Sequence, residues 1–195
     1  MNRNDLQEML LEFENVCFSG GAVGADRLFG LWAEENGHEE VHFSFKGHKA
    51  HVKPETVLEL PFEMLTCNEV GVQLKLANKA LGRSVPRWGY VYNLLARNSY
   101  QICCTERVYT IGQLVSPTQL DGGTAWAVQM YLDLNDDDKE IYHFDIMDKL
   151  TYKYCNETKQ FIQVDSVPAP HGRWTGIGTR RATEEDLRAF EAKFI

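Results

Sequence analysis

Short glycine-rich segments constrain the fold of this chain more than any other feature of its sequence. One reads Ser-Gly-Gly-Ala-Val-Gly-Ala-Asp over residues 19–26, and another reads Asp-Gly-Gly-Thr-Ala-Trp-Ala over residues 121–127. The first directly follows an apolar run at 16–18, the second follows the run at 108–111 after a loop, and each opens into a helical pattern. In α/β proteins a strand, a glycine turn and a helix in this order point backbone N–H groups at an anion. Two such turns in one domain predict a site for a phosphorylated or nucleotide-like ligand.

Apolar runs and helical spacings alternate along the rest of the chain. The patterns predict strands at 16–19, 41–45, 107–111, 140–144 and 173–176, and helices at 5–14, 25–35, 123–134 and 183–194. Residues 55–104 form a helix-rich elaboration, residues 112–121 a loop, and residues 145–172 a connector with a hairpin of 152–154 and 161–164. Thr183 and Asp186 fit a variant capping box at the start of the last helix. This alternation predicts one α/β domain over 1–195, with a mainly parallel sheet covered by helices on both faces.

Composition narrows the class of partner. The chain has 195 residues, 44% of them hydrophobic, which is enough for an ordinary core. Its formal net charge of −8 argues against a general DNA or RNA binder, which would present a basic face, but leaves a small anionic ligand possible. Residues 1–14 are too polar for a secretory signal, and no apolar run approaches the roughly 20 residues of a membrane span. We therefore expect a cytoplasmic protein with no membrane partner.

The cysteines and histidines do not indicate a disulfide framework or a metal site. Five cysteines, an odd number, include no C-x-x-C pair, and they predict reduced thiols. The histidines at 42, 48, 51 and 143 lack a metal-ligand spacing and are interpreted as ordinary polar or partly buried side chains. We expect no cofactor and no metal.

The motif at 19–26, together with Gly-Gly-Thr-x-x-Ala at 122–127, resembles the SLOG superfamily. This Rossmann-like group includes the DNA-processing protein A fold, the "Lonely guy" phosphoribohydrolases, and many phage and bacterial proteins of nucleotide ligands. Its members typically begin with a strand ending in Gly-x-Gly-[Ser/Thr]-Arg, one helix before the Ser-Gly-Gly motif. Here Thr-Gly-Ile-Gly-Thr-Arg at 175–180 resembles that opening motif but comes after the others. The resemblance therefore implies a circular permutation, in which strand 173–176 lies beside strand 16–19.

The resemblance covers about residues 16–48, 90–145 and 173–194, and it implies one ligand site shared by three turns. The candidate residues are Ser19, Gly20, Gly21, Ala22, Gly24 and Asp26 in the first turn, Gly122, Gly123 and Thr124 in the second, Gly176, Gly178, Thr179 and Arg180 in the third, and Lys46, Arg97 and Asn98 from neighbouring segments. We expect the turns to share the C-terminal edge of the sheet. Turns of this kind can also serve only to pack a helix on a strand. Lys46 can equally be a solvated side chain, and a surface position at a helix start is the alternative for Arg180.

Two further assignments stay open at this point. Asp26 either caps helix N–H groups or bonds a ribose hydroxyl. Trp126 is more easily read as a core residue than as a platform for stacking a base.

The second glycine motif favours binding over catalysis. The phosphoribohydrolases carry Pro-Gly-Gly-x-Gly-Thr-x-x-Glu, whose Glu supports cleavage of the N-glycosidic bond. This chain has no Glu on the corresponding helix, so Asp26 and Asp121 are the only acidic candidates in the turns. The resemblance thus implies capture of a nucleotide-derived small molecule, such as an NAD-derived or cyclic nucleotide signal. A compact phage protein of this kind could act in the host cytoplasm as a sponge for immune signals.

Two other functions and one state of assembly are also expected from the resemblance. One function is a nucleotide N-glycosidase that uses Asp26 or Asp121, and the other is a single-stranded DNA module of the DNA-processing type, which the acidic balance disfavours. Proteins of this superfamily are commonly dimers or larger. Aromatic residues of the helix-rich stretch look exposed and predict a homodimer or higher oligomer: Phe62, Trp88, Tyr90, Tyr92 and Tyr100.

Overall fold

The computed structural model describes residues 2–84, 87–134 and 138–195. Its strands are β1 (Val16–Ser19), β2 (Glu39–Phe45), β3 (Val57–Leu60), β4 (Arg107–Gly112), β5 (Leu114–Ser116), β6 (Gln119–Leu120), β7 (Glu140–Asp145), β8 (Thr151–Cys155), β9 (Gln160–Val164) and β10 (Arg173–Gly178). Its α-helices are α1 (Arg3–Leu11), α2 (Ala25–Glu35), α3 (Phe62–Leu65), α4 (Asn68–Leu81), α5 (Tyr90–Ile102), α6 (Thr124–Leu132) and α7 (Glu184–Glu191), and a 3-10 turn covers Pro54–Thr56.

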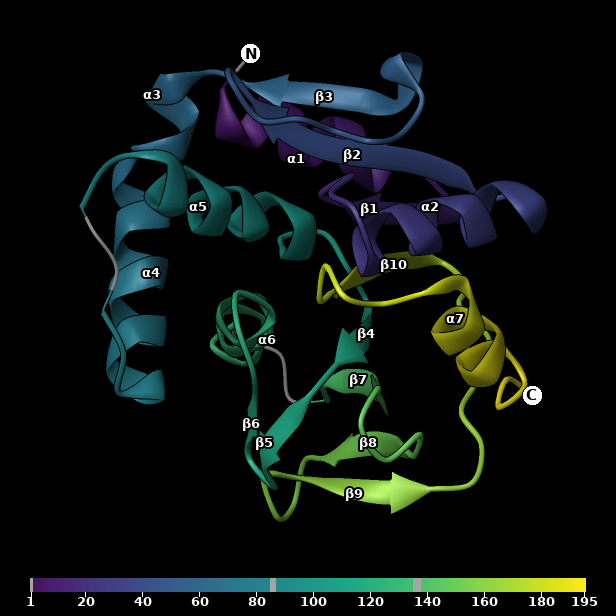
Figure 1. The fold of residues 1–195 in the computed structure, drawn as a ribbon. Helices are drawn as coiled ribbons and strands as arrows, with labels where there is room; N and C mark the ends of the chain where they lie inside the picture. Colours follow the sequence, from purple (N-terminus) through teal and green to yellow (C-terminus); the bar gives the residue numbers. More distant parts are fainter. Residues whose placement is uncertain (1, 85–86, 135–137) are drawn as a thin grey trace.

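One eight-stranded sheet organises the molecule, in the order β3-β2-β1-β10-β4-β7-β8-β9 (Figure 1). The pairs from β3 to β7 are parallel, and β8 and β9 add an antiparallel hairpin at one edge. This confirms the predicted Rossmann-like α/β fold with a mainly parallel sheet. A small separate hairpin of β5 and β6 follows β4.

The strand that follows all the other described strands in the chain lies in the middle of this sheet. β10 pairs with β1 on one side, Val16 opposite Arg173, and with β4 on the other, Trp174 opposite Arg107. The predicted neighbourhood of strands 16–19 and 173–176 is therefore confirmed. Because the pairing is parallel on both sides, the carboxyl ends of β1, β10 and β4 meet at the same edge of the sheet.

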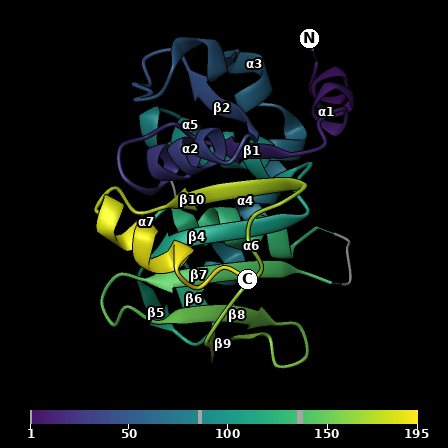
Figure 2. The same ribbon diagram turned by 90° about the vertical axis from the view of Figure 1, so that its right-hand side faces the viewer.

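Helices cover both faces of the sheet, and the strands supply an apolar side chain to each face. In β1, Val16 and Phe18 belong to the core under α1, α4, α5 and α6, whereas Cys17 belongs to the core under α2 and α7. Figure 2 shows α2 and α7 in front of the sheet, with α4, α5 and α6 behind it. On α2, Phe29 and Trp32 make edge-to-face contacts with Trp174 of β10, at centroid distances of 5.9 and 5.6 Å. Each such buried side chain contributes about 1.5–3 kcal/mol.

Local capping fixes where the terminal helices begin. The side chain of Asn2 accepts hydrogen bonds from the N–H groups of Asn4 and Asp5, so α1 begins at Arg3 rather than at residue 5. Before α7, Thr183 and Asp186 form the predicted capping box. Lys149 donates to the same Asp186 carboxylate at 2.6 Å, which ties the connector to α7.

The structure differs from the sequence-based expectations in two segments. The helix-rich stretch 55–104 contains an unpredicted edge strand, β3, which pairs with β2. The expected loop 112–121 contains the β5–β6 hairpin. The predicted hairpin in the connector is present as β8 and β9, and it extends the main sheet by pairing β8 with β7.

The predicted exposure of the aromatic residues holds for only some of them. Tyr100 is fully buried, and its hydroxyl donates to the Met64 carbonyl at 2.7 Å. Trp88 is 75% exposed, Phe62 61% and Tyr90 48%, whereas Tyr92 is partly buried against the core. None of the helices in the described ranges is both long and apolar enough to cross a bilayer. The cysteines at 17, 67, 103, 104 and 155 are all free.

Candidate functional site

A cavity of about 590 Å³ opens at the carboxyl ends of β10 and β4, where the connections leave the sheet in opposite directions. β1 leads on to β2 and β3, whereas β4 leads on to β7, and ligands of open α/β sheets bind at such a switch point. The lining residues come mainly from the start of α2 and the turn before it, from α5, from the ends of β4, β7 and β10, and from the start of α6: Ala22, Asp26, Ser84, Val91, Leu94, Leu95, Arg97, Asn98, Gly112, Gln113, Leu120–Thr124, Trp126, His143 and Ile177–Arg181.

The first and third glycine turns lock into each other beside this cavity. Gly24 has φ +88°, and a Cβ there would lie 2.5 Å from the carbonyl oxygen of Thr179. That carbonyl accepts a hydrogen bond of 3.1 Å from the N–H of Ala25, the first residue of α2. Gly178 approaches α2 equally closely, since a Cβ there would lie 2.7 Å from the Cβ of Ala25. The backbone of the third turn therefore occupies part of the N-terminus of α2.

A buried arginine fills the space above Gly20. A Cβ on Gly20 would lie 2.5 Å from Nη1 of Arg97 and closer still to the rest of the guanidinium. Arg97 is only 5% exposed, although it is a charged residue, and its Nη1 donates to the Gly20 carbonyl at 2.8 Å. Its position on α5, far along the chain, brings α5 over the end of β1. Glycine is therefore required at residue 20 to admit the Arg97 side chain.

The other glycines of the first and third turns also face protein atoms. Gly21, with φ +62°, lies under the loop after β2, where a Cβ would meet Val52 at 3.1 Å and Ala50 at 3.3 Å. The His51 N–H holds that loop by donating to the Gly21 carbonyl at 2.7 Å. Gly176 packs against Phe29 of α2, with a Cβ expected 2.8 Å from Cδ2.

Of the predicted site residues, the structure brings ten into the lining of the cavity: Ala22, Asp26, Arg97, Asn98, Gly122, Gly123, Thr124, Gly178, Thr179 and Arg180. Asp121, the other acidic candidate, lines it as well. The remaining six, Ser19, Gly20, Gly21, Gly24, Lys46 and Gly176, lie outside this lining. Ser19 donates through its hydroxyl to the Gly176 carbonyl at 2.6 Å, and Lys46 is exposed on the loop after β2.

Asp26 and Arg97 form a loose buried pair at the floor of the cavity. The Asp26 Oδ1 accepts from the Gly178 N–H at 3.3 Å, and its Oδ2 lies 3.5 Å from Nη2 of Arg97. Burial raises the pKa of Asp26, and the guanidinium and the Gly178 N–H oppose that rise. Burial likewise lowers the pKa of Arg97, and the Asp26 carboxylate opposes that fall. Both oxygens of Asp26 thus have protein partners, and the residue joins α2, α5 and β10.

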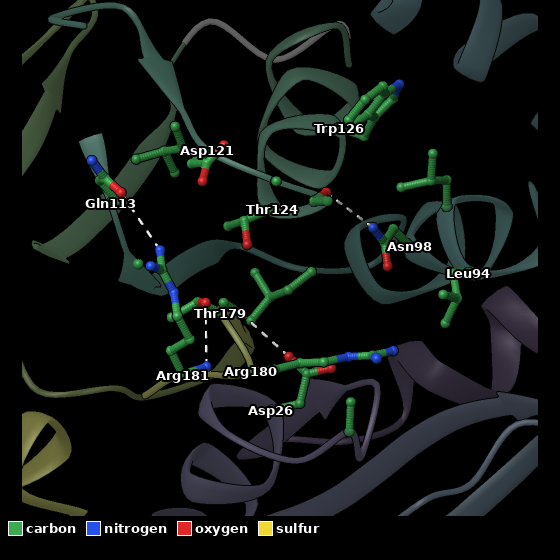
Figure 3. Close-up of a pocket in the computed structure, with 18 of the residues that line it drawn as sticks. Asp26, Leu94, Asn98, Gln113, Asp121, Thr124, Trp126, Thr179, Arg180 and Arg181 are labelled. Atoms are coloured by element: carbon green, nitrogen blue, oxygen red, sulfur yellow. Dashed lines mark hydrogen bonds between the residues drawn. The ribbon is translucent and has the colours of Figure 1, made fainter. Parts of the chain in front are cut away.

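The second glycine turn remains open to the cavity. Gly122 has φ +60°, and apart from its chain neighbours no described residue has a heavy atom within 4 Å of the place where its Cβ would be, whereas a Cβ on Gly123 would lie 3.6 Å from Leu95. No side chain of the described residues caps the N-terminus of α6 by a hydrogen bond. The Thr124 hydroxyl points from this helix end into the cavity (Figure 3). Uncapped N–H groups and the helix dipole make such an end favourable for an anion.

A buried amide from α5 lies beside that helix end. The Asn98 Nδ2 group donates weakly to the Gly123 carbonyl, at 3.5 Å, and the side chain is almost fully buried. Its Oδ1 has no hydrogen-bond partner among the described residues. An unpaired buried carbonyl oxygen costs about 1–3 kcal/mol. A ligand that donates an N–H or O–H to Asn98 Oδ1 would remove that cost.

The cavity also contains residues that the sequence did not single out. His143, from β7, shares a 2.7 Å hydrogen bond with the Thr110 hydroxyl, and burial lowers its pKa while Asp145 opposes the fall. Arg83 lies outside the lining but holds the second turn, since it donates to the Gly122 carbonyl at 3.2 Å and covers the Trp126 ring at 5.1 Å. Trp126 itself is only partly buried and lines the cavity.

No signal in the sequence pointed to His143 or Arg83. Neither residue belongs to a recognisable motif, and contacts between segments that are distant in the chain determine where each one lies. Within the described ranges, no group of three or more His, Cys, Asp or Glu side chains is arranged to hold a metal ion. Comparison with models of known protein families, with curated proteins and with solved structures gave no match for this chain.

Proposed function

We propose that this chain binds a nucleotide-derived small molecule in the cavity between α5, α6 and β10, as a SLOG-like protein. The observation that carries the proposal is the open N-terminus of α6, with the Thr124 hydroxyl at its first turn and the unpartnered Asn98 Oδ1 beside it. This end supplies donors for a phosphate. The amide oxygen accepts a hydrogen bond from a base or a sugar hydroxyl.

The remaining walls suit the apolar faces of such a ligand. Val91, Leu94, Leu95, Trp126 and Ile177 line the cavity. A volume of about 590 Å³ lies within the roughly 300–1,000 Å³ of small-molecule sites. Small-molecule sites combine mainly apolar walls with a few polar groups that orient the ligand, and this cavity has that composition.

The positions of the acidic residues favour binding without turnover. A catalytic carboxylate needs an oxygen within hydrogen-bond reach of the reacting atoms. Both oxygens of Asp26 are engaged, by Gly178 and Arg97, and Asp121 is exposed on the loop before α6. We therefore propose sequestration of the ligand, which fits a role as a sponge for a nucleotide signal such as a phage protein would need against host defence.

One observation keeps the nucleotide N-glycosidase as the second candidate. Asp26 lines the cavity, and burial raises its pKa, which is a property of many general acids. If it acts in this way, Asp26→Asn retains ligand affinity and abolishes release of the base. If Asp26 only positions Arg97 and β10, the same variant leaves the bound molecule chemically intact.

The test combines mass spectrometry with calorimetry. Denaturing the purified protein should release an intact nucleotide, and Thr124→Val should weaken binding of that nucleotide about tenfold, since one charge-assisted hydrogen bond is lost. Thr118→Val is the matched control, because Thr118 is exposed on the β5–β6 hairpin outside the cavity. Release of free base and sugar phosphate would favour the enzyme. Equal affinity of Thr124→Val and Thr118→Val would place the ligand elsewhere.

A further inference from the structure

A second, basic pocket of about 350 Å³ adjoins the main cavity on the side of the loop after β2. Its polar groups come from His48, Lys49, His51 and Arg180, and Val23 and Tyr90 add apolar surface. None of the described residues that line it is acidic, although the chain as a whole carries a formal net charge of −8. We call it the basic pocket.

The basic pocket and the main cavity share two lining residues, Ala22 and Arg180. Arg180 is exposed and lies directly after the interlocked third turn, so its backbone is held close to Gly24. A molecule that extends out of the main cavity past Arg180 therefore enters the basic pocket. The loop that carries Lys49 and His51 is fixed against the first turn by the hydrogen bond from His51 N–H to Gly21.

The hydrogen bonds of His48, at the floor of the basic pocket, determine the protonation state of its ring. Its Nε2 lies 3.2 Å from Nη1 of Arg97, and its Nδ1 lies 3.0 Å from the Ser44 hydroxyl. A guanidinium can only donate, so Nε2 accepts, and the ring carries its proton on Nδ1, which donates to Ser44. His48 is therefore neutral, and the positive charge beside it is that of Arg97.

The positive charge of the Arg97 guanidinium behind His48 is only partly neutralised by a carboxylate. Burial lowers the pKa of His48 to about 4, and Arg97, Arg180 and His51 add to that effect. Behind His48, Arg97 has one carboxylate contact at 3.5 Å, and its Nε has no hydrogen-bond partner among the described residues. A buried guanidinium with so loose a pairing leaves a positive potential that an anion would neutralise.

We propose that the basic pocket is a second phosphate site and that the ligand is a nucleotide with two separate phosphate groups. One phosphate lies at the N-terminus of α6 and the other lies among Lys49, His51 and Arg180, so Arg180 contacts the molecule between them. The assignment of the first phosphate rests on the proposed function of the main cavity. The second site stands on the basic pocket alone.

Pyrophosphate tests the second site without any nucleotide. In an NMR titration at pH 5, the ring resonances of His48 should move toward those of the protonated form, because a nearby anion favours the imidazolium. Lys49→Gln/His51→Gln should weaken this binding at least about tenfold. Lys46→Gln is the matched control: Lys46 is exposed on the same loop but lines neither cavity. Unchanged His48 resonances in the unmodified protein, or equal affinity in all three proteins, would overturn the proposal.

Nucleotides separate the failure of this inference from the failure of the proposed function. Adenosine 3′,5′-bisphosphate should bind at least about tenfold more tightly than adenosine 5′-monophosphate, and Lys49→Gln/His51→Gln should abolish that difference while leaving the monophosphate affinity unchanged. If both nucleotides bind equally, the second phosphate site is wrong and the main site stands. If pyrophosphate moves His48 and neither nucleotide binds, the proposed function is wrong and only the anion site remains.

Discussion

The contact between Gly20 and Arg97 allows a quantitative test of how this site is built. Gly20 is not among the glycines with positive φ, so Ala is permitted by the backbone, and the cost of Gly20→Ala is purely steric. The new Cβ would overlap the guanidinium, at 2.5 Å from Nη1, and would displace it. Displacement also breaks the 2.8 Å bond from Nη1 to the Gly20 carbonyl. Overpacking of this kind costs about 1–3 kcal/mol, and a lost hydrogen bond to a charged group costs about 1.5–3 kcal/mol, so we expect about 3 kcal/mol.

Arg97→Ala should be destabilising for a different reason. It leaves the Asp26 carboxylate buried without its guanidinium partner, and breaking a buried pair costs about 3–5 kcal/mol. The 3.5 Å separation of the pair favours the lower end of that range. In this background the Cβ of Gly20→Ala no longer meets a guanidinium. Its effect should therefore fall to about zero, which gives a coupling energy of about 3 kcal/mol in the double-mutant cycle.

Urea unfolding followed by tryptophan fluorescence measures all four proteins of the cycle. Gly71→Ala is the control for the substitution itself, because Gly71 lies within α4 with open space around it. Ala there should stabilise the protein by about 0.5–1 kcal/mol. Effects of Gly20→Ala and Arg97→Ala that add within about 0.5 kcal/mol would refute the reasoning. They would mean that the guanidinium does not occupy the space above Gly20.

Three further predictions concern charge, affinity and assembly. The folded-state pKa of His48, about 4, lies below the ordinary value of 6.5, so the free energy of unfolding should fall as the pH drops from about 6.5 to 4. His48→Gln should reduce this dependence in urea unfolding at several pH values, and an unchanged slope would contradict the assignment. Arg180→Ala should weaken nucleotide binding about tenfold in calorimetry, whereas Arg188→Ala, on α7 away from both cavities, should not. The predicted oligomer should be visible by sedimentation at micromolar concentration and should weaken in Trp88→Ser, the most exposed of the aromatic residues in question; a monomer in both proteins would exclude it.

The sequence was most informative for features that depend on residues close together in the chain. Strand, turn and helix follow from local apolar patterns, and the capping box of Thr183 and Asp186 lies within one turn of a helix. The pairing of β10 with β1 was predicted as well, but through a resemblance of its glycine motif and not through local chemistry. β3 was missed because four residues at a sheet edge give too short a pattern within a helix-rich stretch.

The partners of the glycines could not be read from the sequence. Gly-Gly indicates that something approaches the backbone, but not whether it is a ligand or a side chain from elsewhere in the chain. At Gly20 it is Arg97, separated by 77 residues, and at Gly21 it is the loop that carries Val52. Only the second turn, at Gly122, keeps its open space. The basic pocket was equally invisible, because it exists only where that loop and Arg180 come together.

The central place of β10 has a consequence for how the molecule is made on the ribosome. Until this strand has left the exit tunnel, β1 to β3 and β4 to β9 can form only two half-sheets, and the adjoining sides of β1 and β4 present unpaired backbone groups to each other. The nascent chain thus has a gap between β1 and β4 that one parallel strand fills. Insertion of β10 into this gap pairs residues that are far apart in the sequence, and folding steps of this kind are slow. A detached peptide with the β10 sequence would compete for the same gap. The main cavity and the basic pocket are complete only when this strand is in place, because Ile177–Arg181 line the one and Arg180 lines both.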